Sequence, residues 1–184
     1  IECGVFCCLS GRLYFSGGLN RLRRGDDMKI QWKPLLICVA IPLAVGGLAA
    51  LLSREGMNVF ASLEKPPLSP PGWLFPVVWT ILYVLMGIAS YLVFTSGADR
   101  KTVGAALRVY GFQLAVNFLW PIFFFNFGWY LFSFVWLLLL LLLILVTFAR
   151  FWKISVPAAC LLIPYLIWVV FAGYLNLGVA LLNA

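Results

Sequence analysis

Five runs of about 20 apolar residues dominate the sequence, and each is long enough to cross the roughly 30 Å hydrocarbon core of a bilayer. Of the 184 residues, 64% are hydrophobic and only 10% are charged, whereas a soluble domain has about 25% charged residues. The sequence therefore predicts an all-α integral membrane protein, a bundle of five transmembrane helices. We expect the spans at about 34–52, 72–94, 103–125, 129–149 and 156–182.

The first 27 residues differ in character from the rest. They lack an initiating Met, a sustained apolar stretch and a small-residue cleavage site, so they are a poor match to a signal peptide. Met28 is followed by basic residues and then by the first apolar run, a pattern typical of the start of a membrane protein. We therefore expect residues 1–27 to be a non-native or disordered leader and residues 28–184 to be the membrane domain.

The distribution of positive charge predicts the orientation. An odd number of spans places the chain ends on opposite sides of the membrane. From Met28 onward, the loops on the N-terminal side carry Lys29, Lys33, Arg100, Lys101, Arg108, Arg150 and Lys153, and the opposite side carries only Arg54 and Lys65. By the positive-inside rule, the N-terminus lies in the cytoplasm of a bacterial cell. A eukaryotic copy would lie in the mitochondrial outer membrane and need its own argument about sidedness.

Histidine is absent, and no acidic residue lies within an apolar run. The chain therefore lacks the commonest metal ligand and the usual general base, and we predict no metal site and no required cofactor. Proton pumps and voltage sensors usually place ionisable groups in the membrane, so the sequence argues against both. No basic stripe of the kind that binds nucleic acid is present.

Three of the five spans present a stripe of aromatic side chains with amides or hydroxyls at helical spacing. The second span has Trp79, Tyr83, Met86, Gly87 and Ser90, the third has Gln113, Asn117, Trp120, Pro121 and Phe124, and the fifth has Tyr165, Trp168, Ala172, Leu175 and Asn176. Such residues also form interfacial belts and contacts between helices. The fourth span is a leucine run, which we expect to face lipid.

Depth in the membrane separates the two interpretations of the tryptophans. Trp73 lies at a span end, where belt residues occur, whereas Trp79 and Trp168 lie about a third of the way into their spans. Together with Asn117 and Asn176 they would suit a flat, largely apolar ring system that offers one polar edge.

Three segments in order resemble one known family. EKPPLSPPGWLFPVVWTILYVLMG, YGFQLAVNFLWPIFFF and IPYLIWVVFAGYLN resemble the first loop with the second helix, the third helix and the fifth helix of the TspO/MBR family, the family of translocator protein, the peripheral-type benzodiazepine receptor and tryptophan-rich sensory protein. The resemblance extends over about residues 33–183. It implies a five-helix bundle, often dimeric, that binds porphyrins such as protoporphyrin IX and haem, and benzodiazepine-site ligands, in a cavity among the helices.

The resemblance also implies roles for individual residues. The ligand-binding residues would be Trp73, Trp79, Tyr83, Asn117, Trp120, Trp168, Ala172, Leu175 and Asn176. The first loop would form a lid with Lys65, Pro66, Pro70 and Pro71, since prolines lower the entropy that a loop loses on ordering. Gly111 and Ala115 form a small-xxx-small pair that we expect at a homodimer contact, although packing against a neighbouring helix of the same chain is the alternative.

Two further functions stay open at this point. Some bacterial relatives have been proposed to degrade porphyrin in light and oxygen, and here Trp79 and Trp168 would be the reactive groups. The other possibility is a scaffold for membrane proteins.

The sterol-recognition pattern that animal members carry at the end of the last helix is missing from LNLGVALLNA, which argues against sterol binding there. The segment RVYGFQL at 108–114 fits the reversed pattern. We expect a receptor or transporter of tetrapyrroles.

Overall fold

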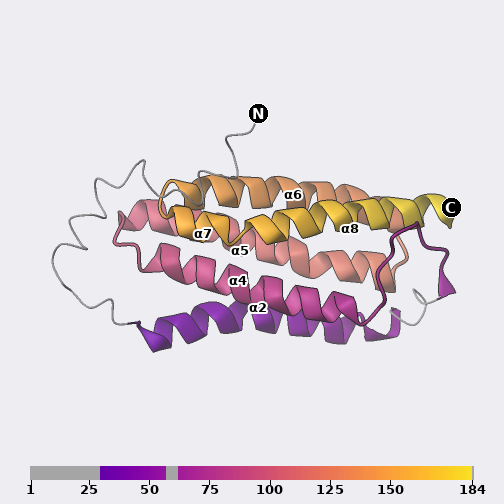
Figure 1. The fold of residues 1–184 in the computed structure, drawn as a ribbon, viewed down its shortest axis with the longest axis horizontal. Helices are drawn as coiled ribbons and strands as arrows, with labels where there is room; N and C mark the ends of the chain where they lie inside the picture. Colours follow the sequence, from indigo (N-terminus) through magenta and orange to yellow (C-terminus); the bar gives the residue numbers. More distant parts are fainter. Residues whose placement is uncertain (1–29, 57–61, 184) are drawn as a thin grey trace. The chain divides into compact units, whose positions relative to one another are not determined.

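The computed structural model of the protein describes residues 30–56 and 62–183. The predicted leader at 1–27 lies outside the described residues and stays a prediction. From Lys33 onward the chain forms one compact unit. Its helices are α2 (Trp32–Leu52), α4 (Leu74–Phe94), α5 (Arg100–Pro121), η2 (Ile122–Asn126), α6 (Tyr130–Trp152), α7 (Val156–Cys160) and α8 (Ile163–Leu182) (Figure 1).

The five predicted spans are confirmed. Among the described residues, five helical segments are long and apolar enough to cross a membrane, at Trp32–Leu52, Leu74–Phe94, Arg100–Asn126, Tyr130–Trp152 and Val156–Leu182. The bounds lie within three residues of the predicted ones. The protein is thus an all-α bundle of the integral membrane class.

Local sequence explains where the helices begin. Asp99 caps α5, because its Oδ2 accepts hydrogen bonds from the backbone N–H groups of Lys101 and Thr102, both at 3.1 Å. Gly128, with a φ of +65°, makes the left-handed turn that lets α6 follow the preceding helix after a very short link. These signals keep neighbouring spans antiparallel.

Two spans are less regular than the sequence predicts. The fifth is interrupted at residues 161–162, between α7 and α8, because Pro164 has no N–H to donate to the carbonyl of Cys160. The third ends in the π-helical turn η2, directly after Pro121. In this turn the N–H of Phe127 donates to the carbonyl of Ile122, 3.2 Å away.

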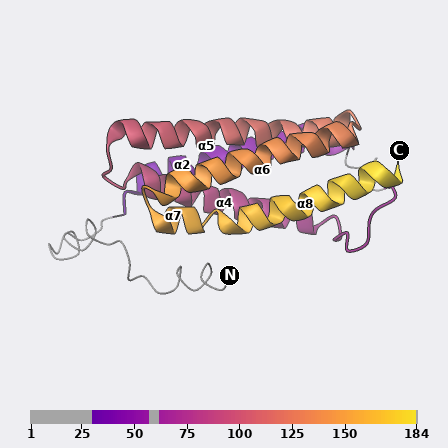
Figure 2. The same ribbon diagram turned by 90° about the horizontal axis from the view of Figure 1, so that it is seen from above.

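The contacts between helices place the predicted stripes inside the bundle. α6 contacts both α5 and α8, and Figure 2 shows it running beside α5, while α4 contacts α5 and α7. α2 crosses α4 very closely at Gly87, where a Cβ atom would lie 2.5 Å from the Cα of Val39. The stripes predicted on the second, third and fifth spans face the interior: Tyr83, Met86, Gln113, Asn117, Trp120, Tyr165, Ala172 and Asn176 are all buried.

A short segment that we call the strap, residues 62–73, precedes α4. Figure 1 shows it at the same end of the bundle as the C-terminal end of α8. The leucine run of α6 exposes Leu138 and Leu142 and buries Leu137 and Leu140, so one face of this helix packs in the bundle and the other points outward. The prediction that this run faces lipid therefore applies only to the outward face, because Leu137, Leu140 and Ile144 pack in the core.

Candidate functional site

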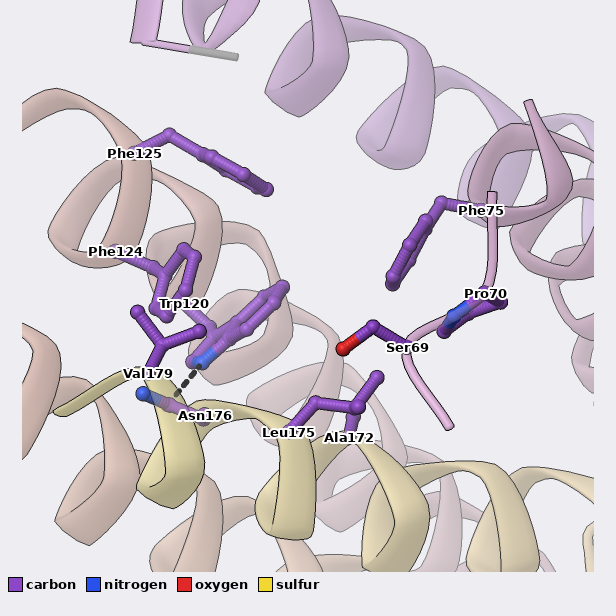
Figure 3. Close-up of a pocket in the computed structure, with 10 residues that line it drawn as sticks. All are labelled: Ser69, Pro70, Phe75, Trp120, Phe124, Phe125, Ala172, Leu175, Asn176 and Val179. Carbon is purple, nitrogen blue, oxygen red and sulfur yellow. Dashed lines mark hydrogen bonds between the residues drawn. The ribbon is translucent and has the colours of Figure 1, made fainter. Parts of the chain in front are cut away.

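A small cavity lies beneath the strap, where α4, α5, η2 and α8 come together. Its lining residues are Ser69, Pro70, Phe75, Trp120, Phe124, Phe125, Ala172, Leu175, Asn176 and Val179 (Figure 3). None of these side chains carries a charge. The free volume at the centre is about 30 Å³, which has room for about one or two water molecules.

Aromatic rings from the end of α5 and from η2 form one wall of the cavity. Trp120 and Phe124 are stacked, with ring centroids 5.3 Å apart and an interplanar angle of 23°. Phe125 meets both rings edge-on, at 4.9 Å from Phe124 and 6.0 Å from Trp120. Trp120 and Phe124 are four residues apart and share a helix face. Phe125 joins them at the π-helical turn, a feature often found at functional sites.

Asn176 ties this wall to α8 and α6. Its Oδ1 accepts a hydrogen bond from the indole N–H of Trp120 at 3.3 Å, and its Nδ2 donates to the carbonyl of Tyr130 at 2.9 Å. Asn176 and Trp120 are only 1% and 6% exposed. The amide therefore fixes the plane of the Trp120 ring relative to α8.

A second layer of aromatic and polar side chains lies deeper in the bundle. The ring of Trp79 lies 5.6 Å from that of Tyr83 and 6.1 Å from that of Tyr165. The Nδ2 of Asn117 donates to the Tyr83 hydroxyl at 3.0 Å. Phe75 links the two layers, because it lines the cavity and also packs edge-on against Trp168 at 5.9 Å.

One buried polar atom of this layer, the Nε1 of Trp168, has no hydrogen-bond partner within the described structure. In a membrane-spanning bundle such a group is costly, because lipid cannot pair with it. The indole N–H of Trp168 could therefore donate to a polar group that enters the interior.

The structure divides the predicted ligand-binding residues between these layers. Trp120, Ala172, Leu175 and Asn176 line the cavity together with Pro70 of the strap. Trp79, Tyr83, Asn117 and Trp168 belong to the deeper layer. Trp73 stands apart from both: it is 67% exposed at the start of α4, as a belt residue would be, and does not line the cavity.

Of the other predicted lid residues, Lys65 and Pro71 are exposed and Pro66 is buried. The sequence-based site omitted Ser69, Phe75, Phe124, Phe125 and Val179, which also line the cavity. Helical spacing alone would have found Phe75, four residues before Trp79, and Val179, three after Asn176.

The predicted dimer contact lies on a different surface. Gly111 and Ala115 are exposed and face away from the buried Gln113 and Asn117 on the same helix. A Cβ atom at Gly111 would meet nothing within 4 Å. The two small residues lie in an apolar groove between α2 and α5, lined by Ile41, Val45, Leu48, Gly111, Leu114, Ala115, Phe118 and Leu119.

Comparison with known proteins places these features in a family. Residues 38–182 match the model of the TspO/MBR family. The chain belongs to the TspO/MBR family. It is 41% identical over 154 residues to the translocator protein of Bos taurus, a match that covers 81% of this chain and 89% of the bovine protein. It is 37% identical over 157 residues to the tryptophan-rich protein TspO of Chlorobaculum tepidum, covering 85% of this chain and 99% of that protein.

A third relative has another name. Protein CrtK of Rhodobacter capsulatus is 37% identical over 124 residues, covering 67% of this chain and 78% of CrtK. The matched segment of this TspO/MBR protein contains all five membrane-spanning segments except the first turns of α2. The resemblance deduced from the three sequence segments is therefore confirmed at the level of the family, and the protein is an integral membrane protein.

Proposed function

We propose that this TspO/MBR protein is a membrane receptor or transporter that binds porphyrins, such as protoporphyrin IX and haem, and benzodiazepine-site ligands beneath the strap. The observation that carries the proposal is the aromatic, uncharged cavity formed by Trp120, Phe124 and Phe125 against α8. Aromatic faces of this kind stack on flat ring systems. The names of the relatives, translocator protein and tryptophan-rich protein TspO, fit such a role but do not state a ligand.

The two layers would make different contacts with the ligand. The face of a flat ring would stack on Trp120 and Phe124, while a polar edge would use the unpaired indole N–H of Trp168. Phe75 lies between these groups, since it lines the cavity and contacts Trp168. No charged side chain is needed at the rings themselves. Binding is thus expected to depend on stacking area more than on charge.

The ligand would have to widen the cavity. Sites for drug-sized molecules have volumes of about 300–1,000 Å³. The free volume at the centre of this cavity is about 30 Å³, at most about a tenth of that. The strap supplies Ser69 and Pro70 to the lining. Displacement of the strap is therefore the simplest way to admit a large ring.

A titration of protoporphyrin IX into the protein in lipid nanodiscs tests the proposal, with the Soret absorbance as readout. Trp120→Leu removes a stacking face and should weaken binding by about 1–3 kcal/mol, or about fivefold to 150-fold. Trp152→Leu is the matched control, because Trp152 lies at the opposite end of α6 from Tyr130 and the cavity. Equal weakening in both variants would indicate nonspecific partitioning and defeat the proposal.

The second candidate function is light- and oxygen-dependent degradation of porphyrin. One observation favours it: the ring of Trp79 lies close to those of Tyr83 and Tyr165, so three oxidisable side chains are close together in the bundle interior. Illumination of bound protoporphyrin IX in oxygenated buffer separates the two functions. Loss of porphyrin that stops in Trp79→Phe and Trp168→Phe supports an enzyme, whereas bleaching at the rate of free porphyrin supports a receptor.

Orientation and assembly are part of the same proposal. We place the N-terminus in the cytoplasm of a bacterial cell membrane, or the protein in the mitochondrial outer membrane of a eukaryote, because positive charge is concentrated in the loops on the N-terminal side. We assign the homodimer contact to the groove with Gly111 and Ala115, where small exposed residues allow helices to approach closely.

A further inference from the structure

Asn183, the C-cap residue of α8, binds the strap through its side chain. The Oδ1 of Asn183 accepts a hydrogen bond from the backbone N–H of Glu64 at 3.1 Å, and its Nδ2 donates to the carbonyl of the same residue at 2.9 Å. The Nδ2 also donates to the carbonyl of Val179 at 2.9 Å, which fixes the side chain to the helix end. Asn183 thus pairs with both backbone groups of one strap residue, as a neighbouring strand would.

Two more contacts join α8 to the strap. The hydroxyl of Tyr174 donates to the carbonyl of Pro67 at 2.9 Å. One turn further along, Gly178 lets the ring of Pro66 lie against the helix: a Cβ atom at this position would be 2.5 Å from the Cγ of Pro66. Tyr174 and Gly178 are four residues apart and share a helix face, so this face of α8 contacts the strap, with Asn183 at the helix end.

Contacts within the strap join its residues to one another. Its prolines have fixed φ angles, and the hydroxyl of Ser69 donates to the carbonyl of Pro66 at 2.8 Å, which closes a turn around Leu68. Leu68 has a φ of +66°, an unusual value for a residue other than glycine. Because Pro66 and Ser69 are joined in this way, a contact at one end of the turn sets the position of Ser69 and Pro70 over the cavity.

We propose that Asn183, Tyr174 and Gly178 form a latch on α8 that holds the strap closed over the cavity and sets how fast ligands enter. The inference rests on the proposed function for the identity of the ligand, but the latch itself holds the strap in the absence of ligand. With the strap held down, the cavity centre has only about 30 Å³ of free volume. Each ligand must therefore wait for the latch to open.

Two substitutions open the latch without touching the cavity lining. Gly178→Ala places a methyl group against Pro66 and pushes the strap off the helix. Tyr174→Phe removes one hydroxyl and keeps the ring that stacks on Phe171. Gly173→Ala is the matched control on the same helix, because its Cβ atom would meet only the ring edge of Phe134, at 3.9 Å.

The first measurement needs no ligand. Hydrogen exchange of the Glu64 amide, whose N–H bonds to Asn183, is followed in the full chain in nanodiscs. Exchange should be about threefold to tenfold faster in Gly178→Ala and Tyr174→Phe, the change expected for one lost hydrogen bond. It should stay at the wild-type rate in Gly173→Ala. Unchanged exchange in both latch variants would overturn the proposal.

The second measurement is stopped-flow binding of protoporphyrin IX. The latched strap leaves too little room for a large ring, so the latch must open before the ligand enters, and both latch variants should speed entry by about threefold to tenfold, whereas Gly173→Ala should not. A structural contact that does not gate the cavity would leave the rate of entry unchanged even where Glu64 exchanges faster, and that result would overturn the gating role.

Failure of the proposed function is distinguishable from failure of the latch. If wild-type protein does not bind protoporphyrin IX, the proposed ligand is wrong, and the exchange rate of the Glu64 amide alone decides the latch. Faster exchange in Gly178→Ala and Tyr174→Phe but not in Gly173→Ala would then support it. Equal exchange in all four proteins would overturn it.

Discussion

The hydrogen bond between Trp120 and Asn176 is predicted to stabilise both the bundle and the ligand site. Asn176→Ala leaves the buried indole N–H without an acceptor, which costs about 1–3 kcal/mol, and it removes the bond to the carbonyl of Tyr130, worth about 1 kcal/mol. We therefore expect a loss of about 2–4 kcal/mol in the free energy of unfolding. Trp120→Phe removes the N–H donor but keeps an aromatic ring.

A double-mutant cycle isolates the bond. If the pair acts as the structure indicates, Trp120→Phe and Asn176→Ala together should destabilise the protein by about 1 kcal/mol less than the sum of the two single changes, because the orphaned N–H is then gone. The assay is unfolding by sodium dodecyl sulfate in mixed micelles, followed by far-ultraviolet circular dichroism so that loss of an indole does not alter the signal. Simple additivity would refute the role given to the bond.

Other changes should act through packing, stacking and association. Gly87→Ala should destabilise the bundle by about 1–3 kcal/mol in the same unfolding assay, because its Cβ atom would enter the backbone of α2, whereas Gly47→Ala, with nothing within 4 Å, should not; equal stability of the two variants would show that α2 does not cross here. Trp168→Ala and Asn117→Ala should each weaken protoporphyrin IX binding by about 1–3 kcal/mol in the Soret titration, and wild-type affinity would remove them from the site. Gly111→Leu should lower the cross-linked dimer fraction in nanodiscs and leave ligand affinity intact, since the residue is exposed; an undiminished dimer would move the interface elsewhere.

Periodicity and apolar length were sufficient to predict the spans and their inward faces. Amides and aromatics recur at intervals of three and four residues, which places them on one side of each helix. Tyr83, Asn117 and Asn176 belong to these stripes, and all three are buried. Such a stripe states which face points inward. It does not state at which depth the faces of different helices meet, so the division of Trp120 from Trp79 into two layers was not predictable.

Local departures from regular helix escaped the sequence patterns for a different reason. The π-helical turn at η2 brings Phe125 to the cavity wall beside Phe124, although adjacent residues on a regular α-helix point about 100° apart. The break before α8 follows from Pro164, which the sequence shows but whose effect depends on the packing around it. The contact between Glu64 and Asn183 joins residues 119 positions apart, and no local pattern encodes it.

The central claim is that a flat tetrapyrrole binds in the aromatic cavity beneath the strap, and blocking that cavity tests it most directly. Ala172→Phe places a ring in the cavity lining, while Val170→Phe places the same ring on the outward face of the same helix, where Val170 is 58% exposed. Circular dichroism first establishes that both variants are folded in nanodiscs. The account predicts that protoporphyrin IX binds saturably to the wild type and to Val170→Phe but not to Ala172→Phe. Equal saturable binding to both variants would contradict it.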